Sequence, residues 1–257
     1  MLRTLIFDVD GTLADTESAH LAAFNQAFAE FGLDWRWDEA LYTRLLDVSG
    51  GKERILHYWR TAQPPLPEAN PMAMQDIVDR LHALKTSAYE RAVDSGAVSL
   101  RPGVLRLMDE ALAGGLQLAI ATTTSPTNIA ALLRRAVGPN WRRNFAAIGD
   151  ASNAPLKKPH PQVYLNVLAA LQRAPAACLA FEDSGNGLRA AAAAGIATII
   201  TPTDYTAHHD FNAALRVVPD LGAVDVTQLR SWHGESVRAR TAVDTGEHAR
   251  AAPVRAL

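Results

Sequence analysis

Two aspartates stand at the end of a short apolar run near the start of the chain. Residues 5–7 are apolar, and Asp8 and Asp10 follow them in the stretch LIFDVDGTLADT. Two carboxylates this close repel each other and lose hydration when they are buried, so they need a positive partner. A metal ion would serve, because hard cations such as Mg2+ prefer oxygen ligands.

Three more polar groups occur later in the chain, each beside an apolar run or a helix start. They are the threonines Thr122, Thr123 and Thr124, the lysines Lys157 and Lys158, and the acids Glu182 and Asp183. Acids, hydroxyls and a lysine that meet at one place can bind a metal ion and stabilise the charge of a phosphate.

The DVDGT stretch has two simpler interpretations. A calcium loop needs Gly at its sixth position and Glu at its twelfth, but counting from Asp8 these positions hold Leu13 and Ala19. An Asp-Gly turn fits the stretch taken alone. The second acid pair, Glu182-Asp183, argues against a mere turn.

The TTTSPTN stretch also has two interpretations. Ser125 and Pro126 are typical of a helix N-cap and first helical position. The same helix start aims free N–H groups at an anion, with the Thr122 hydroxyl beside them. Both interpretations can hold together, and the position after an apolar run favours phosphate.

The elements that position these residues are apolar runs alternating with helical patterns. We predict strands at residues 2–8, 116–122, 145–150, 177–183 and 196–201. Strands that are apolar on both faces and alternate with helices indicate a parallel sheet covered on both sides, an α/β fold. Ligands bind beyond the carboxyl ends of such strands, which is where the polar groups fall.

Residues 17–95 show only helical patterns, with helices expected near 37–47, 52–62 and 72–94 and the PPLPEANP stretch as a loop. The first strand must pair with later strands, so this block is an insertion after it. We therefore predict a Rossmann-like core at 1–16 and 96–230, a helical cap at 17–95 and a polar C-terminal tail at 231–257.

The composition is that of an ordinary soluble protein. The 257 residues are 48% hydrophobic and 20% charged, with a net charge of -2, which gives no pull toward nucleic acid or an anionic membrane. No apolar run reaches the roughly 20 residues of a membrane span, and Asp8 interrupts the N-terminal run before it resembles a signal peptide. The single cysteine, Cys178, excludes an intramolecular disulfide and suggests a core position in a cytoplasmic protein.

The motifs DVDGTLADT, ATTT, KKPHP and FEDSGNG, in this order and spacing, resemble the four motifs of the haloacid dehalogenase superfamily of phosphohydrolases. The helical insertion resembles the small cap of that superfamily. The similarity spans roughly residues 2–220.

The resemblance implies a role for each core residue. Asp8 would attack phosphorus and become an aspartyl-phosphate, and Asp10 would act as general acid and then as general base. Mg2+ would be held by the Asp8 carboxylate, the Asp10 backbone carbonyl and Asp183, with Glu182 assisting directly or through water.

The phosphate would be held at two further places. Thr122 and the N–H groups that follow it, at Thr123 and Thr124, would bind phosphoryl oxygens. Lys158 would pair with Asp8 and the phosphate; Lys157 is an alternative, but family members place the lysine directly before the proline.

The stretch GGKER places Gly50 and Gly51 just before a helix that carries Arg54. Backbone N–H groups and a guanidinium could bind a second anion there. A helix start with a surface arginine fits the local sequence equally well.

Three other cap residues could contact a substrate. Glu17 and His20 follow the nucleophile closely, although a packed histidine fits His20 nearly as well. Lys85 lies on the last cap helix, where a solvated lysine is the ordinary expectation.

Within the superfamily, the chain looks closest to the CbbY-like branch. Its members are xylulose-1,5-bisphosphate phosphatases found with carbon-fixation genes, and they remove an inhibitor of Rubisco. The resemblance therefore predicts a magnesium-dependent sugar-bisphosphate phosphatase that acts as a monomer on a small molecule. The alternatives are a β-phosphoglucomutase, a phosphatase of phosphoglycolate or a hexose phosphate, and a binding protein without turnover. The intact Asp8, Asp10, Lys158 and Asp183 argue against the last.

Overall fold

A six-stranded parallel sheet forms the centre of the computed structural model, which describes residues 1–62 and 74–250. The strand order is β3-β2-β1-β4-β5-β6. The strands are β1 (Thr4–Phe7), β2 (Gln117–Ala121), β3 (Phe145–Gly149), β4 (Cys178–Glu182), β5 (Ala197–Ile200) and β6 (Arg216–Val217). The predicted PPLPEANP loop lies outside the described residues.

The first strand occupies the middle of the sheet. Phe7 is paired with Ile120 of β2 on one side and with Phe181 of β4 on the other. The residues that follow these three strands therefore meet at one edge of the sheet. All four residues of β1 are buried, as expected for a strand covered on both faces.

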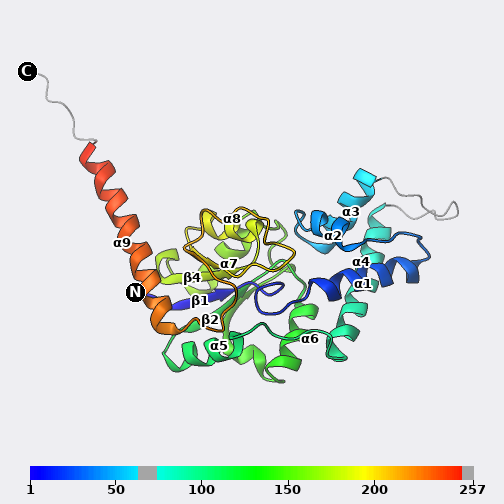
Figure 1. The fold of residues 1–257 in the computed structure, drawn as a ribbon, viewed down its shortest axis with the longest axis horizontal. Helices are drawn as coiled ribbons and strands as arrows, with labels where there is room; N and C mark the ends of the chain where they lie inside the picture. Colours follow the sequence, from blue (N-terminus) through cyan, green and yellow to red (C-terminus); the bar gives the residue numbers. More distant parts are fainter. Residues whose placement is uncertain (63–73, 251–257) are drawn as a thin grey trace, which may run out of the picture.

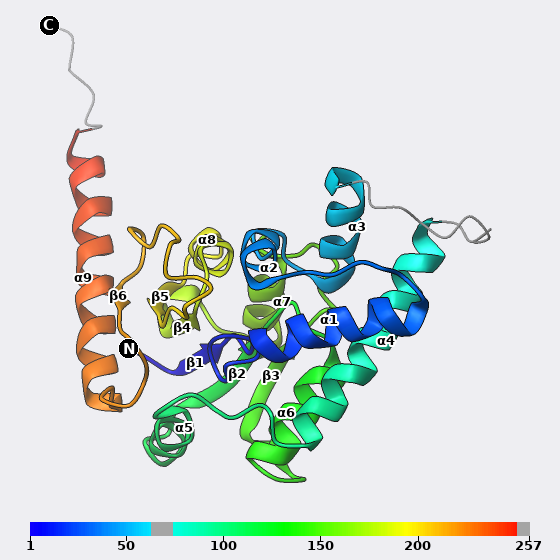
Figure 2. The same ribbon diagram turned by 45° about the vertical axis from the view of Figure 1, so that its right-hand side comes forward.

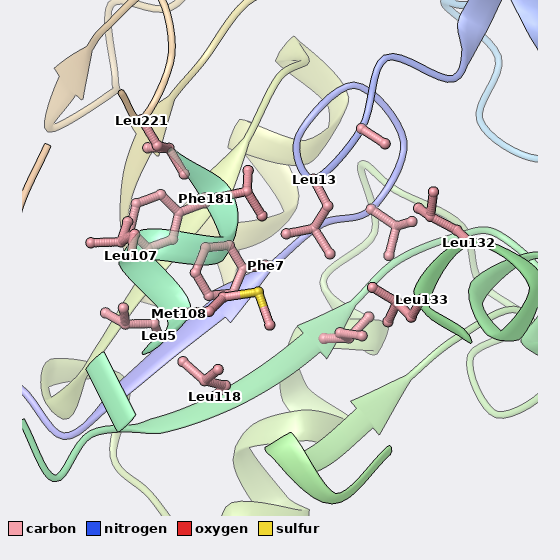
Figure 3. Close-up of a cluster of buried hydrophobic side chains, with 14 of the residues drawn as sticks. Leu5, Phe7, Leu13, Leu107, Met108, Leu118, Leu132, Leu133, Phe181 and Leu221 are labelled. Atoms are coloured by element: carbon pink, nitrogen blue, oxygen red, sulfur yellow. The ribbon is translucent and has the colours of Figure 1, made fainter. Parts of the chain in front are cut away.

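Helices cover both faces of the sheet (Figures 1 and 2). On one face lie α5 (Val104–Ala113), α6 (Pro126–Ala136) and the start of α9 (Val226–Arg250), whose apolar side chains pack with Leu5, Phe7, Leu118 and Phe181 (Figure 3). On the other face lie α7 (Gln162–Leu171) and α8 (Gly185–Ala193). Two short 3-10 helices, at Trp141–Asn144 and Pro175–Ala177, precede β3 and β4.

Among the described residues, four helices stand between β1 and α5, and we call them the cap: α1 (Glu17–Phe31), α2 (Glu39–Leu45), α3 (Gly51–Ala62) and α4 (Met74–Asp94). The cap has its own apolar cluster, built around Phe24, Phe28, Trp35 and Trp37. The predicted fold class, a parallel α/β core with a helical insertion after the first strand, is confirmed. The cap is not isolated, because α4 also packs against α6 of the core.

The two segments that connect the cap to the core lie side by side. Ala14 in the first forms an antiparallel bridge with Leu100 in the second, and the Arg101 amide donates to the Leu13 carbonyl over 2.9 Å. The cap therefore leaves and re-enters the core at one place, which acts as a paired base for the insertion.

The Arg101 side chain ties this base to the core. Its guanidinium donates to the backbone carbonyls of Gly11, Thr201, Pro202 and Pro219, and only 8% of the side chain is exposed. Gly11 lies in the loop that carries the two aspartates, so Arg101 holds that loop against the residues that follow β5.

The C-terminal region differs from the sequence-based expectation of a polar tail. A single helix, α9, runs from Val226 to Arg250. Its first turns pack on α5 through Val226 and Leu229, and Arg230 donates to the Gly114 carbonyl. Further along the helix, Trp232 packs against the same cluster and Glu235 accepts from Arg216. The rest of the segment is mostly polar, which explains why no helical period is visible in its sequence. The two-residue strand β6 was also not predicted, because it is too short to give a pattern.

Two simple expectations can be compared with the structure. Cys178 is free and buried in the cluster beneath α7 and α8, as predicted. Among the described residues, no helix combines the length and the apolarity that crossing a bilayer requires.

We predict that Arg101→Met lowers the free energy of unfolding by about 3 kcal/mol, because it leaves several buried carbonyls without a donor. Urea unfolding of the two proteins measures this loss. Arg106→Met is the matched control: Arg106 also donates to three carbonyls, but 46% of its side chain is exposed. Equal losses of unfolding free energy in the two variants would show that Arg101 stabilises the protein no more than the exposed Arg106 does.

Candidate active site

One cleft of about 350 Å³ lies between the carboxyl edge of the sheet and the cap. Every site residue predicted from the sequence lines it. From the core these are Asp8, Asp10, Thr122, Thr123, Thr124, Lys158, Glu182 and Asp183, and from the cap Glu17, His20, Gly50, Gly51, Arg54 and Lys85. The structure thus brings both sets together, although their individual roles remain predictions.

Lys158 lies at the centre of the acidic groups. Its ammonium donates to Asp8 Oδ1 over 2.6 Å, to Glu182 Oε1 over 2.5 Å and to the Ala121 carbonyl over 2.8 Å. Burial opposes its charge, but the two carboxylates raise the pKa of Lys158 above its ordinary value. Lys157 does not reach the acids and donates to the carbonyls of Ala151 and Ala154.

The acids Asp8, Glu182 and Asp183 form a cluster in which one carboxylate oxygen from each residue lies within 4.8 Å of the other two. Tyr164 donates its hydroxyl hydrogen to Glu182 Oε1, whereas Glu182 Oε2 is buried and has no hydrogen-bond partner. One lysine cannot balance three carboxylates. An unpartnered buried oxygen within an all-oxygen cluster fits a hard divalent cation such as Mg2+.

Glycine is required where the nucleophile loop passes the cluster. Gly11 has a φ of 76°, and a Cβ there would lie 2.3 Å from Asp183 Oδ2. Any side chain at this position would therefore push the Asp183 carboxylate away from Asp8.

Asp10 is held apart from the other acids by the cap. His20 Nε2 lies 3.0 Å from Asp10 Oδ1, and Lys85 Nζ lies 2.8 Å from His20 Nδ1. Because an ammonium can only donate, Nδ1 of His20 must accept, and the imidazole N–H on Nε2 then points at Asp10. The His20 ring also stacks on Tyr89 with centroids 4.1 Å apart.

The two aspartates consequently differ in acidity. Burial, aided by Glu182 and Asp10 and opposed by Lys158, raises the pKa of Asp8 to about 8. Burial alone would also raise the pKa of Asp10, but His20, Thr16 and Lys85 lower it to about 2. The difference comes from the cap, because His20 contacts Asp10 and Lys85 lies behind it, whereas Asp8 faces the core acids.

The three threonines predicted to bind phosphate lie between the end of β2 and the start of α6. Thr122 follows β2, and Ser125 is the N-cap of α6, accepting from the Asn128 amide over 3.2 Å. Thr123 and Thr124 line the cleft just before this helix start. The predicted N-cap and first-turn proline are confirmed. The Thr124 amide donates to Thr122 Oγ1 over 3.3 Å, and phosphate binding by the N–H groups at this helix start stays a prediction.

The cap supplies a second cationic end. Arg54 is partly buried and donates to the carbonyls of Leu45 and Val48 over 3.1 and 3.3 Å and to the Tyr42 hydroxyl over 3.3 Å. Tyr42 in turn donates to Glu17 over 2.6 Å. The guanidinium is thus fixed in place at the wall of the cleft rather than solvated.

One local expectation was wrong. Lys85 is not a solvated lysine: it is 5% exposed, and burial lowers its pKa to about 8. It lies one helical turn from Leu81 and Tyr89, both buried, on the inner face of α4. His20 satisfies both of its interpretations, since it is packed and also contacts Asp10.

Some residues of the site were not found by sequence reasoning. Tyr164 and His209 stand in segments without a motif, and a phenol or imidazole there gives no signal of its partner. Asn186 and Ser49, which are hydrogen bonded to each other, lie inside or beside quoted motifs and could have been considered.

Known proteins resemble this chain in sequence. A family model described as haloacid dehalogenase-like hydrolase matches residues 2–195. The plasmid-encoded CbbY protein of Cupriavidus necator is 53% identical over 248 residues, which covers 90% of this chain and 97% of that protein.

Solved structures show a similar relationship. A mutant of CbbY from Rhodobacter sphaeroides, in complex with xylulose-1,5-bisphosphate, has a TM-score of 0.81 and 39% identity, covering 87% of this chain and 96% of that one. A β-phosphoglucomutase from Clostridium difficile has a TM-score of 0.76 at 18% identity, covering 92% and 99%. The second similarity shows the fold alone.

We predict that Lys158→Met lowers the free energy of unfolding by about 3–5 kcal/mol in metal-free buffer, because Asp8 and Glu182 lose their shared cation. Denaturant titration in the presence of a chelator measures the loss. Lys157→Met, which removes a half-buried neighbouring lysine that contacts only carbonyls, should lose less than about 1.5 kcal/mol. A loss for Lys158→Met no larger than for this control would show that the acids do not depend on Lys158.

Proposed function

This chain belongs to the haloacid dehalogenase-like hydrolases and is a phosphatase, and we propose that it hydrolyses a sugar bisphosphate with magnesium as cofactor. The cleft has two ends that could each bind a phosphate, and this observation supports a bisphosphate substrate. The acids, Lys158 and the threonines line one end of the cleft. Gly50, Gly51 and Arg54 of the cap line the other end. A monophosphate needs only the first end.

Magnesium is proposed from the acidic cluster. Asp8, Asp183 and the backbone carbonyl of Asp10 would hold the ion, with Glu182 assisting, and these are the hard oxygen ligands that it prefers. When bound, the ion supplies positive charge that neutralises the carboxylates and the phosphoryl oxygens.

Asp8 is the proposed nucleophile. A carboxylate oxygen of Asp8 bonds to phosphorus while the bond from phosphorus to the sugar oxygen breaks, which leaves an aspartyl-phosphate and an alkoxide. Lys158 keeps Asp8 in place through a 2.6 Å hydrogen bond and offers its charge to the phosphate. Asp10 gives the proton that converts the alkoxide into the alcohol.

Asp10 then removes a proton from the water that attacks phosphorus, and Asp8 is released with inorganic phosphate. His20 keeps Asp10 ionised in the free protein, which is the form required for this second step. The first step requires a protonated Asp10. An incoming phosphate favours that form, because a nearby negative charge raises the pKa of a carboxyl group.

Xylulose-1,5-bisphosphate is the substrate we propose. It carries a phosphate at each end, and a CbbY relative binds it in a structure with 39% identity to this chain. A substrate screen distinguishes this proposal from its alternatives, which are phosphomutase activity and hydrolysis of phosphoglycolate or a hexose phosphate. A binding protein without turnover is the outcome if no phosphate ester is hydrolysed.

We expect chelation with EDTA to abolish hydrolysis of xylulose-1,5-bisphosphate and magnesium to restore it. Calcium should inhibit, because its larger and looser coordination shell misplaces the phosphate. Phosphate release measures all three conditions. Asp8→Asn is the matched control, since an amide of the same shape is a poor nucleophile and no magnesium concentration should restore its activity. Full turnover by metal-free protein would refute the proposed cofactor.

We expect Arg54→Ala to lower kcat/KM for xylulose-1,5-bisphosphate about tenfold to a hundredfold, the value of a charged hydrogen bond. The rate with p-nitrophenyl phosphate, which has no distal anion, should change by less than about twofold. Arg60→Ala removes an exposed arginine of the same helix and should change neither rate. Equal losses on both substrates would mean that Arg54 only supports the cap, and a monophosphate would become the better substrate.

A further inference from the structure

Asn186 of the core reaches across the cleft to the cap. It lies in the first turn of α8, three residues after Asp183, and is only 8% exposed. Its Nδ2 donates to the Asp47 carbonyl over 2.9 Å and to Ser49 Oγ over 3.2 Å, while its Oδ1 accepts from Arg189 over 2.6 Å. Both amide hydrogens and the carbonyl oxygen are therefore used, which fixes the orientation of the side chain.

The segment that Asn186 holds is the one that builds the cap end of the cleft. Residues 47–49 lead directly into Gly50, whose φ of 97° turns the chain into α3. The Arg54 guanidinium donates back to the carbonyls of Leu45 and Val48. A displacement of residues 47–49 would thus move both the glycine turn and the guanidinium.

Ser49 extends the same contact into the cleft. Its oxygen accepts from Asn186, so its hydroxyl hydrogen is available for another acceptor, and Ser49 lines the cleft. A phosphate oxygen at the cap end would be such an acceptor.

His209 approaches the same cap segment from the core. Its Nδ1 accepts from the Gly185 amide over 3.1 Å, so the neutral ring carries its hydrogen on Nε2, 3.7 Å from the Asp47 carboxylate. Asp47, His208 and His209 are close enough to hold a metal ion. The hydrogen on Nε2 disfavours that use and favours attraction to Asp47.

We propose that Asn186 is a positioning residue for the distal phosphate: it acts through Asp47 and Ser49 and sets the cap end of the cleft when the cap lies against the core (Figure 2). This inference rests on the proposed function, in which Arg54 binds a second phosphate. Its consequence is that recognition of the far end of the substrate depends on contact between the two domains. Hydrolysis of a monophosphate does not.

A second contact between core and cap provides the control. Arg135 on α6 donates to the Asp94 carbonyl at the end of α4 over 2.8 Å, far along the chain from residues 47–49. Arg135→Ala therefore removes a hydrogen bond of the same kind, from a core side chain to a cap carbonyl. It should loosen the cap without displacing the segment that Asn186 holds.

The test compares Asn186→Ala with Arg135→Ala in the full chain. Asn186→Ala should lower kcat/KM for xylulose-1,5-bisphosphate roughly fivefold to tenfold, mainly through KM. The rate with p-nitrophenyl phosphate should stay within about twofold. Hydrogen–deuterium exchange at residues 47–54 should accelerate in Asn186→Ala and not in Arg135→Ala. Arg189→Ala, an exposed change that frees the Asn186 carbonyl, should act in the same direction by roughly twofold to threefold.

The two measurements separate failure of the inference from failure of the proposed function. A wild-type protein without preference for the bisphosphate would refute the proposed function, while the exchange at residues 47–54 would still report on Asn186. Unchanged exchange in Asn186→Ala, or equal kinetic losses in Asn186→Ala and Arg135→Ala, would overturn the positioning role. If Asn186→Ala does not fold, the same criteria apply to Arg189→Ala.

Discussion

The contact of one buried ammonium with two buried carboxylates is the interaction on which the site depends. Asp8 follows β1 and Glu182 is the last residue of the neighbouring strand β4, each one position beyond the paired residues Phe7 and Phe181, so the sheet itself brings their carboxylates together. Lys158 comes from the loop before α7 and donates to both. Because buried like charges are costly, the carboxylates at this edge of the sheet require a cation, which Lys158 supplies. The negative charge that remains can bind a second cation.

The same edge explains why two neighbouring aspartates have different environments. Asp8 faces the core acids, whereas Asp10 is turned toward the cap and held by His20, which Lys85 orients. In the proposed mechanism, the core provides the groups that contact the reacting phosphorus, and the cap provides His20, the partner that sets the proton affinity of Asp10. The two domains therefore contribute to the chemistry, and the cap is more than a cover over the cleft.

The sequence was sufficient for the fold and for the grouping of the core residues at one edge of the sheet, because both leave local patterns. Doubly apolar runs predict buried parallel strands, and polar residues directly after them must meet at one edge. The environment of Lys85 could not be predicted, since the same helix position can face solvent or a cleft. Arg101 gave no signal either, because its partners are backbone carbonyls, which every residue possesses. The extent of α9 was hidden because its sequence after the first turns is mostly polar.

The paired base of the cap has a consequence for the evolution of the fold. Ala14 and Leu100 fix the points at which the chain leaves and re-enters the core. The entropic cost of closing a loop grows only slowly with its length, so the core tolerates inserts of different sizes at this base. Another insert whose ends meet at the same spacing can replace the cap without moving the strand ends. Substrate range can therefore change with the insert, provided that the new insert also supplies a partner for Asp10 in place of His20.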